Sequence, residues 1–273
     1  MTKDFQAWVL LAMAGTIVVG LTLWRMGLMS RPEAPLVFAS EPALRADVPV
    51  PSSEPRIEHP LGALSPSTEL RGEALRSALA DLLGGEAAAS FLQLVDFPRR
   101  LVATVDNLAR PHAPALVWPV NPTPERFAVN ERGDAPVIAL DNAGRYTPFV
   151  LLAEAVDARR AVDLYLRLYP SLQKAYEELG FPNRYFNDRL IAVIDLLLAT
   201  PQTELPLKLR LMEVKGPIAS LRPWVRYEFA DPELESLSAG QKILLRVGPV
   251  NERRLKEKLA EIRSELASRV VKR

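Results

Sequence analysis

An uncharged segment near the start constrains this chain more than any other feature. Residues 5–24 read FQAWVLLAMAGTIVVGLTLW. A helix of about 20 apolar residues, with a rise of roughly 1.5 Å per residue, matches the thickness of a bilayer's hydrocarbon core. Trp8 and Trp24 lie near its two ends, where indole rings favour the headgroup region. The sequence therefore predicts a transmembrane anchor within residues 1–30, with the lipid bilayer as a partner.

A cleaved signal peptide is the main alternative to an anchor. Lys3 supplies the basic start, but the small residues at 12–14 lie in the middle of the apolar run rather than at its end. Charge does not decide the orientation, because each flank has two positive groups: Lys3 and the terminal amine on one side, and Arg25 and Arg31 on the other. The layout of a signal anchor favours a single-pass protein of the inner (cytoplasmic) membrane whose C-terminal domain lies in the periplasm.

The composition changes after residue 30. Proline removes a backbone donor and fixes φ, so a proline-rich stretch disfavours regular helices and sheets. We expect residues 31–66 to form a disordered linker that holds a folded domain, residues 67–273, away from the bilayer. The prolines of this linker are Pro32, Pro35, Pro42, Pro49, Pro51, Pro55, Pro60 and Pro66.

Helical periodicity dominates the rest of the chain, with glycine and proline as interruptions. The segment 185–198 is apolar over most of its circumference, so we expect it to be the central, buried helix. The other expected helices are 70–83, 87–109 with a break near Pro98, 157–180 with a kink or a division at Pro170, and three that begin at the caps Asp231, Ser238 and Asn251.

Strand signals are few. The apolar segment 136–140 follows 127–129, and the residues 141–144 are typical of a turn. The segment 207–214 alternates apolar and polar residues and can pair with 224–229. The predicted fold class is therefore mainly α (α+β), a helical domain with one or two small β-hairpins.

Few residues offer catalytic or metal-binding chemistry. The chain has no cysteine, and His59 and His112 lie far apart, so we expect no metal and no cofactor. The segment 171–174 matches Ser-x-x-Lys, but the companion motifs of penicillin-binding enzymes are absent from the sequence. A formal net charge of +1, with basic and acidic residues mixed, argues against a nucleic-acid partner.

Two polar clusters are candidates for a binding site, at 185–189 and at 226–231. Arginine in such a cluster can hold a carboxylate or phosphate through two parallel hydrogen bonds. Both clusters also have a structural interpretation, in which they anchor loops, pair with opposite charges or cap a helix. A third cluster, 99–100 with 106–107, is expected to be a solvated helix face. No catalytic residue is identified, and the candidate binding residues are Asn187, Asp188, Arg189, Arg226, Tyr227 and Glu228.

Several segments together resemble a bacterial family catalogued as domain of unknown function number 3014. They are RRLVATVDNL at 99–108, YEELG at 176–180, YFNDRL at 185–190, Asp195 with LATP at 198–201, YEFADP at 227–232 and SAGQK at 238–242. The resemblance covers roughly residues 79–266 and implies a single-span envelope protein of Gram-negative bacteria. It supplies no catalytic residues. The segment 205–216 looks longer than in the family, as a local hairpin insertion would.

These observations favour a non-enzymatic envelope protein that binds another protein or the cell wall on a tether. One alternative is a hydrolase that uses Asp188, Glu228 or Asp231 as acid or base. The other is a sensor of a small anionic ligand, in which the arginines bind the ligand. The oligomeric state does not follow from the sequence.

Overall fold

The computed structural model describes residues 57–62, 70–133, 135–203, 205–212 and 223–270. These residues belong to one compact unit, Ser52–Arg273. The predicted anchor at 5–24 and the linker up to residue 56 lie outside the described residues. Within the described ranges, no helix combines the length and the apolar character that crossing a membrane requires.

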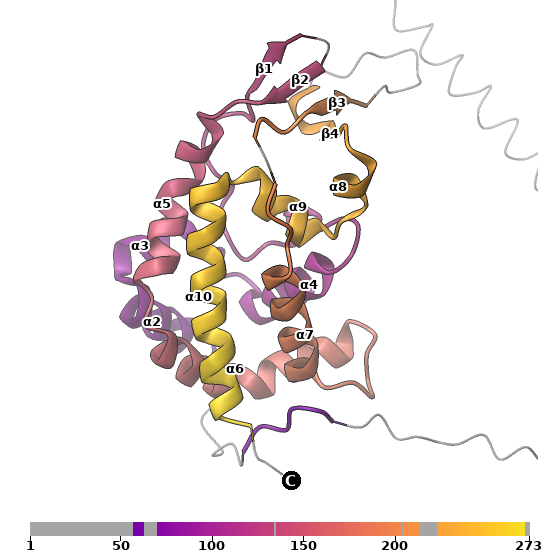
Figure 1. Ribbon diagram of the computed structural model, residues 1–273. Coiled ribbons are helices and arrows are strands. Elements are labelled where there is room, and N and C mark those ends of the chain that lie inside the picture. Colours follow the sequence, from indigo (N-terminus) through magenta and orange to yellow (C-terminus); the bar gives the residue numbers. More distant parts are fainter. Residues whose placement is uncertain (1–56, 63–69, 134, 204, 213–222, 271–273) are drawn as a thin grey trace, which may run out of the picture. The chain divides into compact units, whose positions relative to one another are not determined.

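The described part of the chain is mainly helical, with two small antiparallel hairpins, as predicted (Figure 1). Its α-helices are α2 (Gly72–Leu83), α3 (Gly85–Phe91), α4 (Phe97–Leu108), α5 (Asn142–Ala155), α6 (Ala158–Glu178), α7 (Phe186–Leu198), α8 (Pro232–Ser236), α9 (Ala239–Arg246) and α10 (Pro249–Ser268). Its strands are β1 (Val129–Arg132), β2 (Ala135–Ile138), β3 (Leu209–Leu211) and β4 (Tyr227–Phe229). Short 3-10 turns lie at Ala115–Val117 and Pro223–Val225.

Helix α7 is the central helix, as predicted. Its Val193 and Leu197 belong to a hydrophobic cluster with residues of α4 and α6. Its Ile191 and Ile194 belong to a second cluster, which includes Leu266 of α10. Burying an aliphatic side chain stabilises the fold by about 1.5–3 kcal/mol. Packing on both faces therefore fixes the position of α7.

Helix α10 runs between the two ends of the described unit. It has 20 residues, so it is about 30 Å long. Figure 1 shows the β-hairpins beyond its first turn, α9 beside its first turns, and residues 57–62 beside its last turn. At that last turn Leu61 forms a β-bridge with Val270. Features at the two termini of α10 therefore lie at opposite ends of the unit.

The two hairpins are joined to each other. β3 pairs with β4 in the register Leu209↔Phe229, which confirms the pairing predicted for 207–214 and 224–229. The N–H of Ile138 at the end of β2 donates to the carbonyl of Leu207 at 3.0 Å. The hairpins thus form one continuous patch of strand structure above α9.

The residues 141–144 differ from their prediction as a turn, because α5 begins at Asn142. The Asn142 side chain is 1% exposed. Its Nδ2 donates to the carbonyl of Ala139 at 3.0 Å, and its Oδ1 accepts the N–H of Ala128 at 3.0 Å. These bonds hold the start of the helix against the first hairpin, and the sequence offers no local sign of them.

Local capping signals predict several helix starts correctly. Asp157 and Asp231 each accept a backbone N–H in the first turn of α6 and α8. Ser238 and Gln241 form the complete capping box of α9. α6 is a single helix of 21 residues with Pro170 inside it, so of the two outcomes expected at this proline, a kink or a division, the division does not occur.

The predicted cap at Asn251 is also wrong. α10 begins at Pro249, after Gly248 with a positive φ of 89°, and Asn251 lies inside the first turn. The Asn251 side chain is 3% exposed and donates to the carbonyls of Ala143 at 2.8 Å and Val247 at 3.0 Å. Its role is to fasten α10 to the start of α5.

Replacing Asn251 by serine distinguishes the role of an N-cap from the role of a buried hydrogen-bond donor. Serine is as good an N-cap as asparagine, but it cannot supply the amide donor that reaches Ala143. We expect Asn251→Ser to lower the free energy of unfolding by about 1–3 kcal/mol, because the buried hydrogen bonds of the amide to Ala143 and Val247 are lost. Asp231→Ser, at a true cap, is the matched control and should be nearly neutral. Urea unfolding followed by circular dichroism measures both, and a neutral Asn251→Ser would contradict the buried role.

Candidate functional site

Residues 57–62, which we call the strap, are bound to the first turn of α7. The sequence prediction assigned them to the linker. The Asp188 carboxylate accepts the backbone N–H of Glu58 at 3.1 Å and of His59 at 2.8 Å. Its Oδ1 also lies 3.3 Å from Nδ1 of His59. Proline has no backbone N–H, and Glu58 and His59 are non-proline residues between Pro55 and Pro60. They can therefore supply the N–H groups that the carboxylate binds.

Asn187 and two tyrosines complete the binding of the strap. Asn187 is 0% exposed, and its Nδ2 donates to the carbonyl of His59 at 2.9 Å. Its Oδ1 accepts the hydroxyl of Tyr165 on α6 at 3.0 Å. Burial raises the pKa of Tyr165 well above its ordinary value, so this hydroxyl stays a donor. The hydroxyl of Tyr185 accepts the N–H of Leu61 at 3.2 Å.

Arg189 binds α4 instead of the strap. Its Nε donates to Oδ1 of Asp106 at 2.9 Å, and its Nη2 donates to the Asp106 carbonyl at 2.9 Å. Arg110 binds the other carboxylate oxygen of Asp106. The Asp106 side chain is 3% exposed, so the prediction that 106–107 belongs to a solvated face is wrong for this residue. The guanidinium of Arg189 is thus committed to the packing of α7 on α4.

The other predicted cluster lines a cavity, which we call the aromatic cleft. Its volume is about 640 Å³. It lies between the β3–β4 hairpin, α9 and the loop 111–118. The candidate residues Arg226, Tyr227 and Glu228 all line it. The aromatic residues that form its walls are Trp118, Phe127, Trp224 and Tyr227.

Two arginines of the cleft have no carboxylate partner. Arg226 donates from Nη1 to the carbonyl of Met212 at 2.7 Å, and its buried Nε has no acceptor. Arg246 donates from Nη2 to the carbonyl of Tyr227 at 3.3 Å and lies over the ring of Phe229, 4.6 Å from its centroid. Burial lowers the pKa of Arg246, although an arginine stays charged in a protein. Among the described residues, neither arginine forms an ion pair.

The acidic residues of the cleft are already paired. Glu228 lies 3.0 Å from the guanidinium of Arg210 on the neighbouring strand. Glu235 lies 2.7 Å from the ammonium of Lys242 and accepts the N–H of Phe229 at 2.9 Å. Burial would raise the pKa of Glu235, but the hydrogen bonds from Lys242 and Phe229, together with the positive charges of Lys242 and Arg246, lower the pKa below its ordinary value. Glu235 and Glu228 also attract the guanidinium of Arg246, so its charge is partly offset, whereas Arg226 has no carboxylate partner among the described residues.

The sequence clusters at 185–189 and 226–231 do not meet in one site. Asp188 and Arg189 line a separate cavity of about 720 Å³ beside the strap. The three carboxylates considered for a hydrolase lie apart, because Asp188, Glu228 and Asp231 each line a different cavity. In the part of the chain that the structure describes, no group of three or more His, Asp or Glu residues is arranged to hold a metal ion.

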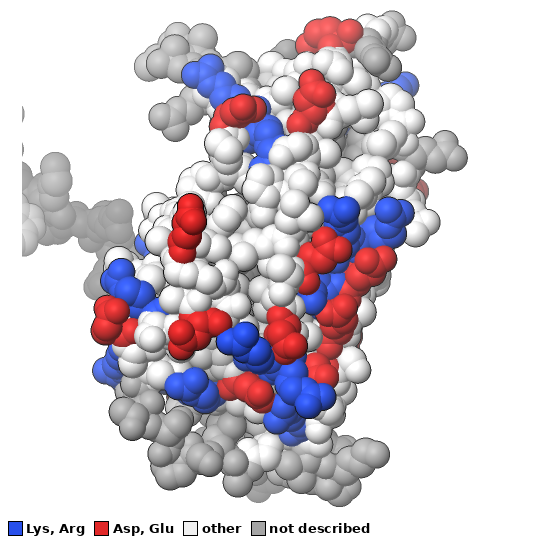
Figure 2. All heavy atoms as spheres, turned by 90° about the vertical axis from the view of Figure 1, so that its left-hand side faces the viewer, with Lys and Arg blue, Asp and Glu red and all other residues white. Residues whose placement is uncertain are grey.

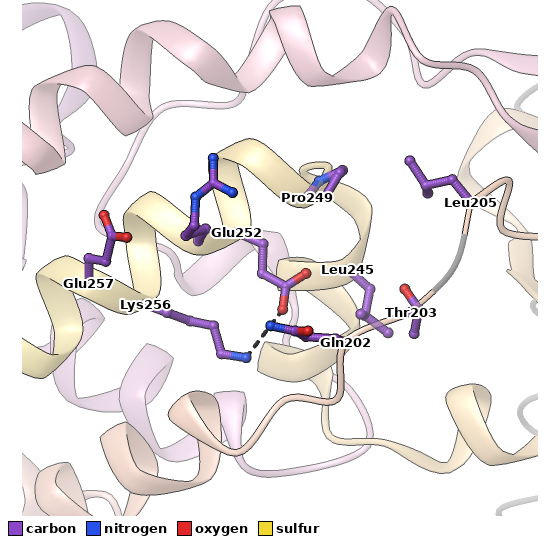
Figure 3. Close-up of a pocket in the computed structure, with 9 residues that line it drawn as sticks. Gln202, Thr203, Leu205, Leu245, Pro249, Glu252, Lys256 and Glu257 are labelled. Carbon is purple, nitrogen blue, oxygen red and sulfur yellow. Dashed lines mark hydrogen bonds and ion pairs between the residues drawn. The ribbon is translucent and has the colours of Figure 1, made fainter.

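A fourth cavity, of about 470 Å³, is lined by Gln202, Thr203 and Leu205 and by residues of α9 and α10 (Figure 3). Figure 3 shows Lys256 and Glu252 reaching toward each other on one wall, 3.3 Å apart. Lys256 also donates to the carbonyl of Thr200 at 2.6 Å. Since these charges already have partners within the wall, this cavity is a weaker candidate than the aromatic cleft.

The face that carries α2, α3 and α5 shows no large area of one charge sign. In Figure 2, blue and red side chains lie interleaved on its lower part, and a band with few charges crosses its middle. Helix α5 contributes only Arg145 and Glu154 as charged residues. A face of this kind does not produce the one-sided field that attracts a charged polymer.

Comparison with known proteins identifies the family. The family model described as "Protein of unknown function (DUF3014)" matches residues 97–263, which is more than half of the chain, so the chain belongs to this family. The match confirms the family resemblance of the sequence, includes the aromatic cleft and Asp106, and leaves out the strap. No curated protein and no solved structure matches the chain.

The burial of Asp106 can be tested by substitution. Asp106→Asn removes the charge that Arg189 and Arg110 share, so we expect the free energy of unfolding to fall by about 2–4 kcal/mol, since breaking a buried pair leaves a cation without its partner. Arg99→Ala, which breaks the exposed pair with Glu178, is the control and should change stability little. Urea unfolding measures both variants. Equal effects of the two substitutions would show that Asp106 acts as a surface residue.

Proposed function

We propose that this member of the DUF3014 family is a non-enzymatic interaction module of the bacterial cell envelope. An N-terminal helix at 5–24 anchors it in the inner membrane, a proline-rich linker follows, and the helical domain lies in the periplasm. There it binds another envelope protein or the cell wall. The uncharged run and the prolines of the sequence support the anchor and the linker.

The strap is the observation that carries this proposal. A linker that served only as a spacer would need no fixed contact with the domain. Here Asn187, Asp188 and Tyr185 bind the main chain of the strap. The domain thus uses buried polar side chains to bind the segment that follows the linker, and this fixes the attachment point of the linker at the first turn of α7.

The position of the aromatic cleft agrees with this attachment point. The strap lies beside the last turn of α10, and the cleft is lined by α9, which immediately precedes the first turn of α10. α10 is about 30 Å long, so the cleft opens at the end of the unit that is remote from the tether. A partner can therefore reach the cleft while the linker holds the opposite end.

The two alternatives fare differently. The hydrolase has no support in the geometry, because its three carboxylates line different cavities and Asp231 caps α8. The sensor of an anionic ligand has one observation in its favour, the excess of positive charge at Arg226, Lys242 and Arg246 over the two acids of the cleft. That observation is also consistent with a protein partner that presents an anionic group.

Site-specific photo-crosslinking in intact cells tests the proposed function. A benzoylphenylalanine placed at Val225, which lines the cleft and is 67% exposed, should give a reproducible crosslinked product. The same residue placed at Val95, which is 71% exposed and lies outside the cleft, is the control and should not give that product. Absence of a product from Val225, or the same product from both positions, would exclude the cleft as the interaction site.

The proposed topology has its own test. Alkaline phosphatase fused after Arg273 is active only outside the cytoplasm, so we expect full phosphatase activity in cells that express the complete chain. Green fluorescent protein that is exported in unfolded form does not become fluorescent. A fusion of this protein at the same position should therefore stay dark. Fluorescence without phosphatase activity would place the domain in the cytoplasm and contradict the proposal.

A further inference from the structure

We propose that the aromatic cleft binds the free carboxyl terminus of a polypeptide whose last residue has an apolar side chain. The terminal carboxylate lies against Arg226 and Arg246, and the apolar side chain lies against the aromatic walls. This proposal rests on the interaction module proposed above and names the chemistry of its ligand.

The charges of the cleft favour one anionic group. Glu228 and Glu235 bind Arg210 and Lys242 and offset the charge of Arg246 only in part. Arg226, Lys242 and Arg246 therefore leave the lining of the cleft with more positive than negative charge. A buried cation that lacks a partner is costly unless a ligand supplies one. A single carboxylate offers two oxygens that can accept hydrogen bonds from both guanidinium groups.

The hydrogen-bond donors of the cleft are held in place before a ligand arrives. Carbonyl oxygens of Met212 and Tyr227 fix the two guanidinium groups. The buried Nε of Arg226 and the buried Nε1 of Trp118 have no acceptor. Buried donors without acceptors are rare because they cost free energy. Donors that are held in place before binding lose little side-chain entropy when a ligand arrives.

The aromatic walls favour a ligand with an apolar body. Trp224 is itself held in position, because the guanidinium of Arg126 stacks on its ring at 4.0 Å from the centroid. Trp118, Phe127 and Tyr227 complete the wall. Aromatic residues that line a cavity gain free energy by burying apolar surface. An inorganic anion would leave this surface unused, whereas an apolar side chain covers it.

A chain terminus combines both chemical groups on one residue. Its carboxylate and its side chain leave the same Cα atom, so a short ligand can contact the arginines and the rings together in a cavity of about 640 Å³. An internal Asp or Glu would bring two flanking chain segments into the same space. The capture of a terminal carboxylate by a dedicated pocket is an established mode of peptide recognition.

A peptide array tests the proposal on the complete protein in detergent micelles. The array holds hexapeptides with a free carboxyl terminus whose last residue varies over all amino acids, and a second array holds the same sequences as C-terminal amides. We expect binding to free termini that end in aromatic or aliphatic residues. Amidation should weaken this binding at least tenfold, because it removes the negative charge. Equal binding to the two arrays, or none above background, would overturn the proposal.

Substitutions then locate the site. Arg226→Gln should weaken binding of the best peptide at least tenfold. Arg246→Lys keeps the charge but loses the planar fork, so it should weaken binding as well. The matched control is Arg253→Gln, an exposed arginine on α10 that lines the cavity of Figure 3 and not the cleft. Circular dichroism confirms that each variant is folded. Unchanged affinity of folded Arg226→Gln would overturn the proposed site.

The outcomes separate this proposal from the proposed function. If crosslinking from Val225 succeeds while free and amidated peptides bind alike, the carboxylate chemistry is wrong and the interaction module stands. If crosslinking also fails, both are wrong. Preference for peptides with an internal acidic residue, with no effect of amidation, would overturn the assignment of the ligand as a chain terminus.

Discussion

The first turn of α7 is buried at Asn187 and half-buried at Asp188 and Arg189, and polar side chains withdrawn from water need hydrogen-bond partners. Asn187 reaches the strap and Tyr165 of α6, Asp188 reaches the strap, and Arg189 reaches Asp106 of α4. Three consecutive residues thus bind three parts of the chain that are distant in sequence. Because the rest of α7 is fixed by apolar packing on both faces, these polar bonds set the arrangement of the surrounding segments.

The elements that depend on neighbouring residues could be predicted from the sequence. Ser238 and Gln241 lie three positions apart and form their capping box without help from the rest of the fold. The alternation in 207–214 similarly predicts a strand that β4 then pairs with. Asn251 and Asn142 were misinterpreted because their decisive partners, Ala143 and Ala128, belong to other elements. At these two helix starts the asparagine side chain forms hydrogen bonds with distant backbone groups instead of capping the helix.

Only the part of the candidate site that has local sequence signals could be predicted. Arg226 and Glu228 belong to one polar and aromatic segment, so the sequence directs attention to them. Arg246 and Trp118 come from α9 and from the loop before the first hairpin, and neither carries a local signal that it lines the same cavity. The interpretation of Arg189 as a ligand residue failed to anticipate Asp106, because two helices far apart in sequence supply the two charges. Cavities depend on such long-range packing.

The strap has a mechanical consequence. A pull on the linker reaches the strap before it reaches α2, because the strap comes first along the chain. The load is borne by the bonds of Glu58, His59 and Leu61 to α7, and these bonds end on the most firmly packed helix. Detaching the strap would break these hydrogen bonds, the bridge from Leu61 to Val270 and the packing of Leu61 on the hydrophobic cluster before any load reached the aromatic cleft at the opposite end of α10.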